Sequence, residues 1–146
     1  MAQPAQPTSA PAVSPLSEAV MYARYALMMF IVAFLIYMLW GVVDMAAYRD
    51  FVLGGIMMGF AIMALISYGF VRPRAYDPLA SGDVATAYQH HVACLILGFI
   101  FGFGLAGVFL VLAYSRAGVF AMAAAARPPA APAQAPAQAP TGQAGA

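Results

Sequence analysis

The sequence predicts an all-α membrane protein with three transmembrane helices between two disordered Pro/Ala-rich tails. Of its 146 residues, 64% are hydrophobic and only 8% are charged, whereas soluble domains carry roughly 25% charged residues. Three long apolar runs contain no Asp, Glu, Lys or Arg between their ends, as expected where a central charge costs about 2.5 to 3.5 kcal/mol. Open strands would leave backbone groups unpaired in lipid, so the runs are predicted to be helices.

The two ends of the chain are expected to be disordered. Residues 1–20 are rich in Pro, Ala and Ser, and residues 118–146 read as a short Ala-rich extension followed by a Pro/Ala/Gln-rich tail. Such segments carry few large side chains to offset the entropy of ordering. The first segment also lacks the basic start and apolar core of a secretory signal peptide, so the first membrane helix is expected to be retained.

The transmembrane domain is expected over residues 21–117, with spans at about 25–43, 51–71 and 92–114. At about 1.5 Å per residue these runs measure about 28, 31 and 34 Å, enough to cross a hydrocarbon core of about 30 Å. The first connection is so short that the first two helices are predicted to form an antiparallel hairpin. The second connection is the internal loop with room for a functional site.

The arginines divide equally between the two faces of a protein with three complete crossings. One face carries Arg24, Arg72 and Arg74, and the other carries Arg49, Arg116 and Arg127. The closeness of Arg72 and Arg74 to each other, together with the N-terminal amine, favours a cytoplasmic N-terminus. The expected location is a bacterial inner membrane.

Small residues predict close helix packing. In the third span they recur every four positions on one face, and further glycines lie on a second face. Lipid is as apolar as leucine, so close backbone contact drives helix association there. One face is therefore expected to pack within the bundle and the other to meet a second protein, although glycine is also simply common in membrane helices. The predicted packing positions are Gly55 and Gly59 in the second span, Gly98, Gly102 and Ala106 on one face of the third, and Gly104 and Gly107 on the other.

Two histidines and the single cysteine lie at the start of the third span. His90 and His91 are expected at headgroup depth on a helix that begins near Asp83, and His90 shares a helix face with Cys94. Two ligands are too few for a tetrahedral metal, and adjacent histidines diverge by about 100°, so they cannot supply both axial ligands of a haem. No cofactor is expected within one chain. The histidines are interpreted as interfacial groups bonded to headgroups, water or a loop; the alternatives are a haem or metal shared with another chain, and a proton-linked role.

Several classes of function lack the residues that they need. The chain has no basic cluster for nucleic acid, too few thiols for a four-cysteine site, and no nucleophile–base pair or paired carboxylates, so no enzyme is expected. The sequence predicts a small noncatalytic subunit or assembly factor of a larger bacterial membrane complex, whose partners are lipid and other membrane subunits or further copies of itself. The alternatives are a haem- or quinone-proximal anchor that shares His90 and His91 with another chain, and a homo-oligomeric pore or small transporter.

Overall fold

The computed structural model describes residues 14–126, which are helical apart from short turns and contain no strand. Three helical segments in this range are long and apolar enough to cross a membrane, which agrees with the predicted all-α class and number of apolar helices: Pro15–Tyr48, Phe51–Ser81 and Leu105–Ala125. Most of the two predicted tails lies outside the described residues. The elements are α1 (Pro15–Val43), the π-helical turn η1 (Asp44–Tyr48), α2 (Phe51–Val71), the π-helical turn η2 (Arg72–Tyr76), α3 (Asp77–Ser81), α4 (Val84–Gln89), α5 (His91–Phe101) and α6 (Leu105–Ala125).

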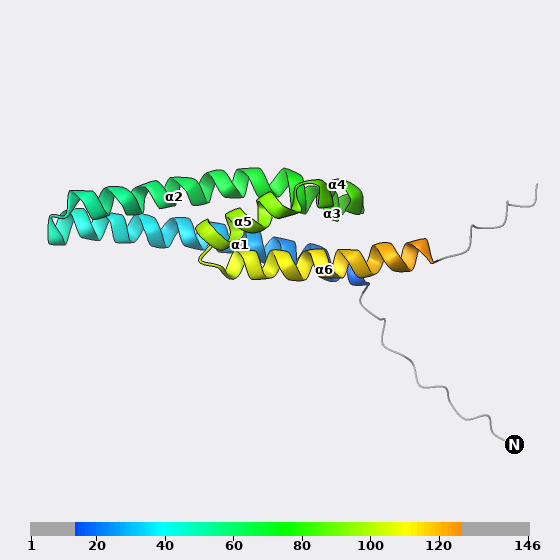
Figure 1. The fold of residues 1–146 in the computed structure, drawn as a ribbon. Coiled ribbons are helices and arrows are strands. Elements are labelled where there is room, and N and C mark those ends of the chain that lie inside the picture. Colours follow the sequence, from blue (N-terminus) through cyan, green and yellow to red (C-terminus); the bar gives the residue numbers. More distant parts are fainter. Residues whose placement is uncertain (1–13, 127–146) are drawn as a thin grey trace, which may run out of the picture.

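Helices α1 and α2 form the antiparallel hairpin that the short first connection predicts (Figure 1). The side chain of Ser14 caps α1 by accepting a hydrogen bond from the N–H of Ser17, so the helix begins at Pro15, inside the segment expected to be disordered. Asp50 caps α2 by accepting two hydrogen bonds from backbone N–H groups of the first turn, at 3.1 and 2.9 Å. Local capping chemistry therefore sets the start of both helices.

The third span differs from the prediction. The prediction of a single helix over residues 92–114 is wrong, because a turn at residues 102–104 divides this segment between α5 and α6. Phe103 and Gly104 have positive φ angles of 54° and 74°, a conformation that ends a right-handed helix and that glycine adopts at little cost. At about 1.5 Å per residue α5 is only about 16 Å long, roughly half of a hydrocarbon core.

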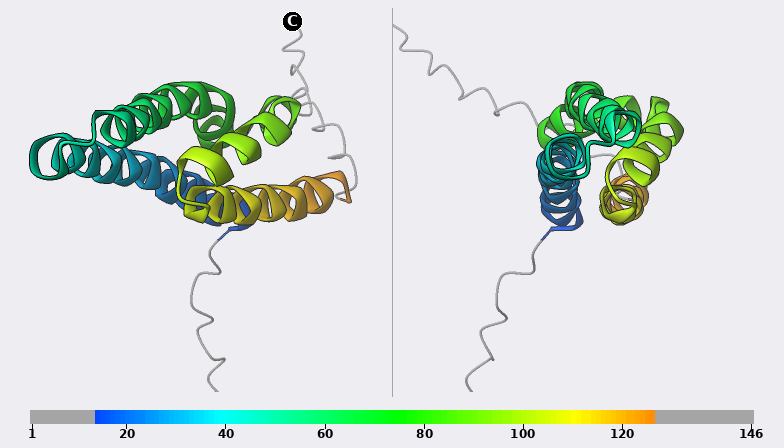
Figure 2. Two further views of the ribbon diagram at one scale, coloured as in Figure 1. Left: turned by 60° about the vertical axis from the view of Figure 1, so that its left-hand side comes forward. Right: turned by 90° about the vertical axis from the view of Figure 1, so that its left-hand side faces the viewer.

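After this turn the chain reverses and α6 runs back toward the end of the bundle where α1 begins (Figures 1 and 2). Arg116 of α6 accordingly forms an ion pair with Glu18 near the start of α1, with a distance of 3.1 Å between Nε and Oε2. Three complete crossings would place the end of the third helix beside the first connection. This expected position is wrong, because the Arg116–Glu18 ion pair places this part of α6 beside the start of α1. The turn η1 lies alone at the far end of the bundle (Figure 1).

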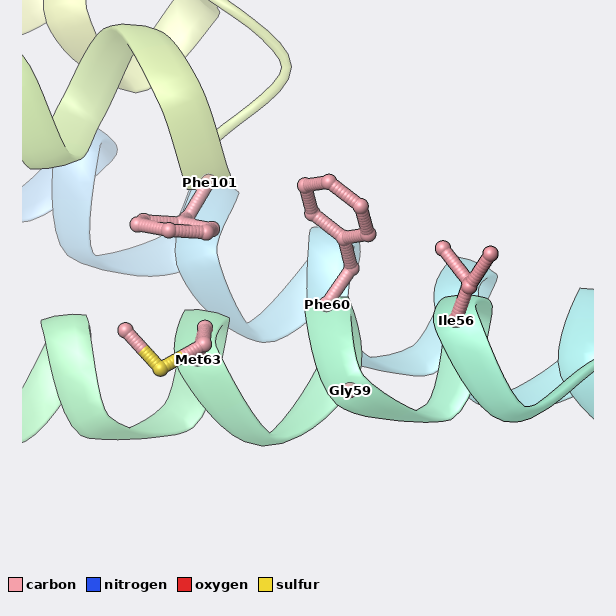
Figure 3. Close-up of a pocket in the computed structure, with 5 residues that line it drawn as sticks. All are labelled: Ile56, Gly59, Phe60, Met63 and Phe101. Atoms are coloured by element: carbon pink, nitrogen blue, oxygen red, sulfur yellow. The ribbon is translucent and has the colours of Figure 1, made fainter.

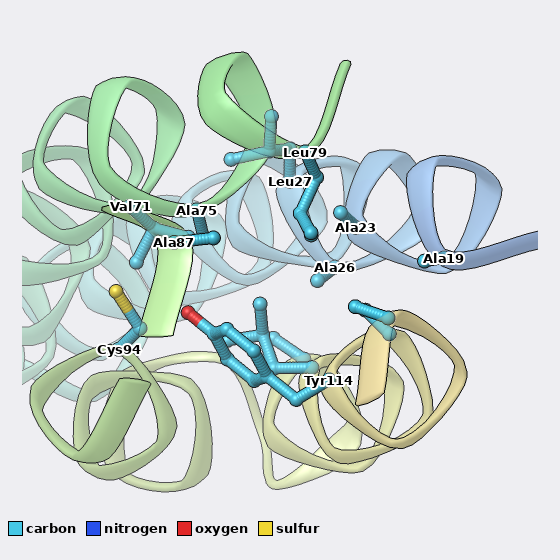
Figure 4. Packing of buried hydrophobic residues seen from close by; sticks show 14 of the residues in the cluster. Ala19, Ala23, Ala26, Leu27, Val71, Ala75, Leu79, Ala87, Cys94 and Tyr114 are labelled. Carbon is cyan, nitrogen blue, oxygen red and sulfur yellow. The ribbon is translucent and has the colours of Figure 1, made fainter. Parts of the chain in front are cut away.

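The core is built mainly from alanines where α1 meets α6 (Figure 4). Ala19, Ala23 and Ala26 are buried on one face of α1, and Ala113 and Ala117 are buried on one face of α6. Their spacing of three or four residues keeps each set on one side of its helix. Methyl side chains let the two helices approach closely, as small residues do in membrane bundles. Larger side chains that are also fully buried are Phe30, Leu79, Val71 and Leu110.

Candidate functional site

Two of the predicted packing glycines make a close contact between α5 and α6. A Cβ atom at Gly98 would lie 2.8 Å from the backbone nitrogen of Gly107, and one at Gly107 would lie 2.6 Å from the ring of Phe99. These glycines were expected on opposite faces of one helix, with one face directed to a second protein. The reversal of the chain instead turns them toward each other, so both are used inside the fold.

The turn between α5 and α6 contains Gly102 and Gly104. Gly102 is buried at the end of α5, where an added Cβ would collide with the Cβ of Ala106, and its carbonyl accepts a hydrogen bond from the N–H of Ala106 at 3.1 Å. Gly98, Gly102 and Ala106 therefore do not form the continuous face that a single helix predicts. Around the turn, the ring of Tyr37 lies 4.5 Å from that of Phe103, centroid to centroid.

The glycines of α2 fall into two groups. Gly54 packs inside the hairpin, because a Cβ there would lie 2.9 Å from the carbonyl oxygen of Gly41 on α1. Gly55 and Gly59 have nothing within 4 Å of the position that a Cβ would take, and the same holds for Gly69 further along the helix. Two of the predicted packing positions thus lie on a part of α2 that no other helix of the described chain covers.

A groove of about 250 Å³ lies beside this uncovered part of α2 (Figure 3). It lies beside the end of α5, whose last residue, Phe101, contributes to its lining. The rings of Phe60 and Phe101 lie 5.9 Å apart and form one wall. Its lining is almost wholly apolar and consists of Ile56, Gly59, Phe60, Met63 and Phe101.

The helix that carries the histidines begins as predicted but is not continuous. The carboxylate of Asp83 caps α4 by accepting hydrogen bonds from the hydroxyl and the N–H of Thr86, at 2.5 and 3.1 Å. The hydroxyl bond, followed by the backbone bond, lowers the pKa of Asp83. Helix α4 ends at Gln89, and α5 begins at His91.

His91 belongs to a small aromatic cluster. Its Nδ1 lies 2.6 Å from the carbonyl oxygen of Tyr88, and its ring lies 5.6 Å from the Tyr88 ring and 5.9 Å from the Tyr114 ring. The hydroxyl of Tyr88 in turn donates a hydrogen bond to the carbonyl oxygen of Tyr114 on α6 at 2.5 Å. Gly118 leaves room for this hydroxyl, which would be 2.9 Å from a Cβ there. The cluster thus joins α4 and the start of α5 to α6.

His90 and Cys94 do not face a common site. His90 is exposed at the junction of α4 and α5, whereas Cys94 is fully buried one turn later. Within residues 14–126, no three His, Cys, Asp or Glu side chains come together as metal ligands. A haem or metal held by these residues would therefore take its remaining ligands from another chain.

The contact between α1 and α6 is the packing site that sequence reasoning missed. The spacing of Ala19, Ala23 and Ala26, with Ala113 and Ala117 in α6, is the same small-residue pattern that was sought among the glycines. Alanine is common enough in this chain that the pattern is not distinctive. The structure identifies it because these alanines are buried where α1 contacts α6, whereas the alanines at the end of α6, from Ala121 to Ala125, are exposed.

Comparison with known proteins adds no further constraint on this arrangement. No family model, curated protein or solved structure matches the chain.

Proposed function

We propose that the chain is a small noncatalytic integral membrane subunit or assembly factor that binds a transmembrane helix of another chain, or of a second copy, through α2. The observation that carries this proposal is the open space beside Gly55 and Gly59, neither of which has an atom within 4 Å of a would-be Cβ. By contrast, Gly98 has backbone atoms within 3.0 Å. A pair of glycines four residues apart lets a second helix approach closely in a bilayer, where burial of apolar surface alone supplies little attraction.

In this proposal α1 and α2 cross the bilayer, while α5 and the first half of α6 enter and leave on the same face. Three observations support the arrangement. The length of α5, about 16 Å, is too short to cross. Arg116 is paired with Glu18 near the start of α1, and this pair is placed outside the hydrocarbon core because a central charge is costly. The turn around Phe103 is packed against Tyr37, as irregular backbone at membrane depth requires neighbouring protein.

The arrangement also changes the division of the arginines. Among the described residues, four arginines then lie at the end of the bundle that holds both the start of α1 and the end of α6, and one lies at the other end. This excess favours a cytoplasmic location for the first end, and hence for the start of α1. The four are Arg24, Arg72, Arg74 and Arg116, and the one is Arg49.

Native co-purification tests the proposed partner. The full-length chain in mild detergent should carry a stoichiometric second membrane protein, or form a dimer, as measured by mass spectrometry. Gly59→Leu should still integrate into the membrane but lose this neighbour, because the new side chain fills the place of closest approach. The proposal fails if the parent purifies with lipid alone, or if Gly59→Leu keeps its neighbour as the parent does.

Gly69→Leu is the matched control. It is the same substitution on the same helix, and Gly69 has equally open surroundings. It lies about 15 Å along the axis from Gly59, where two helices that cross at about 40° have diverged by roughly 10 Å. Binding should therefore survive this change.

Cysteine labelling tests the topology. In a Cys94→Ala background, single cysteines placed at Ser14 and Ala126 should react with a membrane-impermeant maleimide from the same side. A cysteine at Tyr48 should react from the opposite side. Labelling of the Ala126 position together with the Tyr48 position would instead indicate three complete crossings and refute the re-entrant hairpin.

A further inference from the structure

Two adjoining hollows lie on the surface where α1 meets the end of α2 and η2. The first has a volume of about 280 Å³ and the second about 460 Å³. They share Arg24, Met28 and Tyr76, so they form one continuous depression. Its position matches the polar ends of the predicted spans, since Arg24 immediately precedes the first apolar run and Arg72 immediately follows the second. In a bilayer this is the depth of the lipid headgroups.

The polar end of the depression is cationic. Arg24 forms no ion pair within residues 14–126, and Arg72 has only a distant partner, Asp77, at 4.0 Å from its Nε, with both side chains more than half exposed. An exposed contact of this length neutralises little charge. The other two arginines at this end are engaged elsewhere: Arg116 pairs with Glu18, and Arg74 stacks over the ring of Phe70 with its guanidinium carbon 4.1 Å from the centroid.

The rest of the first hollow is apolar and leads away from the arginines along the membrane span. Leu27, Met28 and Ile31 follow Arg24 at three, four and seven residues, so they continue the same face of α1. Met28 and Ile31 are each 43% exposed, and Tyr68 of α2 closes the opposite side. A ligand that fits this surface has an anionic group at one end and a hydrocarbon chain at the other.

We propose that Arg24 and Arg72 bind the phosphate of an anionic phospholipid, with one of its acyl chains lying along Leu27, Met28 and Ile31. Arginine suits this role because its planar guanidinium donates two parallel hydrogen bonds to phosphate oxygens. Basic pockets between membrane helices commonly bind anionic headgroups in this way. The proposal requires that the chain be inserted in a bilayer, but it does not depend on a protein partner for Gly55 and Gly59.

The test is a lipid titration of the purified full-length chain, monitored by native mass spectrometry. The probes are phosphatidylglycerol, phosphatidylcholine and inorganic phosphate. Phosphatidylcholine carries the same phosphate beside a quaternary ammonium, so it measures the contribution of net negative charge. At roughly fivefold per basic residue, the two arginines should favour phosphatidylglycerol by roughly 25-fold. Equal affinity of the parent for both lipids would overturn the proposal, as would displacement of phosphatidylglycerol by millimolar inorganic phosphate.

Two variants locate the site. Arg24→Gln combined with Arg72→Gln should abolish the preference for phosphatidylglycerol, and each single change should reduce it roughly fivefold. Arg49→Gln removes an exposed arginine at the opposite end of the bundle and should leave the preference unchanged. Retention of the full preference in the double variant, or its loss in Arg49→Gln, would overturn the assignment of the site to Arg24 and Arg72. The comparison of phosphatidylglycerol with phosphatidylcholine on the parent chain needs no substitution, so it tests the proposal even if a variant misfolds.

Discussion

Replacing Gly98 with alanine is expected to destabilise the α5–α6 hairpin, because the backbone of α6 occupies the space that the new methyl group needs. The added Cβ would lie 2.8 Å from the nitrogen and 2.9 Å from the Cα of Gly107. Backbone atoms cannot rotate away as the end of a flexible side chain can. The two helices must therefore separate, which would also loosen the contact of Gly107 with Phe99.

Two opposing effects decide the magnitude. Alanine is favoured over glycine within a helix by about 0.5 to 1 kcal/mol, because glycine loses more backbone freedom on folding. Overpacking a close contact typically costs about 1 to 3 kcal/mol. For Gly98→Ala we therefore expect a net loss of about 1 kcal/mol in the free energy of unfolding, the difference between the middles of these two ranges.

Gly69→Ala is the matched control for this experiment, because Gly69 lies outside the proposed helix-binding surface. It adds the same methyl group within a helix, but nothing lies within 4 Å of the new atom. Only the helix preference for alanine applies, so the free energy of unfolding of this variant should rise by about 0.5 to 1 kcal/mol. Unfolding in mixed micelles with increasing dodecyl sulfate, followed by far-ultraviolet circular dichroism, measures both. If the two variants shift the midpoint in the same direction, Gly98 does not pack against Gly107 and the reversed hairpin is refuted.

Three other changes probe local contacts. Gly118→Ala places a methyl group 2.9 Å from the Tyr88 hydroxyl. Losing the hydrogen bond to Tyr114 should cost about 1 kcal/mol and offset the gain that alanine brings within a helix, so the variant should be about 1 kcal/mol less stable than Gly69→Ala in the same titration; equal stability of these two variants would count against this bond. Asp50→Ala removes the cap of α2 and should cost about 1 kcal/mol by the same measurement, whereas Asp50→Ser should keep most of it. Because the pKa of Asp83 is lowered, the stabilisation that its carboxylate provides is complete above the pKa of the unfolded state and is lost as the pH falls through the folded-state pKa. Titration of the Asp83 carboxyl carbon by NMR should give a midpoint below the ordinary aspartate value, and a midpoint at or above that value would contradict the capping geometry.

The features that could be predicted from sequence are those set by neighbours along the chain. Asp83 caps a helix because its carboxylate accepts hydrogen bonds from the N–H and the hydroxyl of Thr86, only three residues away. The α1–α2 hairpin follows from a connection too short for anything but an antiparallel return. The positions of Gly55 and Gly59 on one side of α2 follow from helical periodicity, although periodicity does not indicate what lies opposite them.

The third span shows why the sequence pattern did not predict the reversal of the chain. Hydropathy sums the cost of placing side chains in lipid, and this sum is the same whether residues 92–114 form one helix or two that reverse. Gly102 was interpreted as a packing residue because a helix places it between Gly98 and Ala106. In the structure it lies in the turn next to Gly104, so the apparent face is divided.

By itself, the sequence determined that this chain forms apolar helices, because composition and short-range capping decide helix formation and the length of each apolar run. Only the tertiary structure decided that α5 ends halfway along the bundle, that Gly98 faces Gly107 while Gly55 and Gly59 remain uncovered, and that Arg24 and Arg72 border one depression. Each of these facts depends on which helix lies opposite another. That choice depends on the closeness of packing between residues far apart in the chain, which no local pattern encodes.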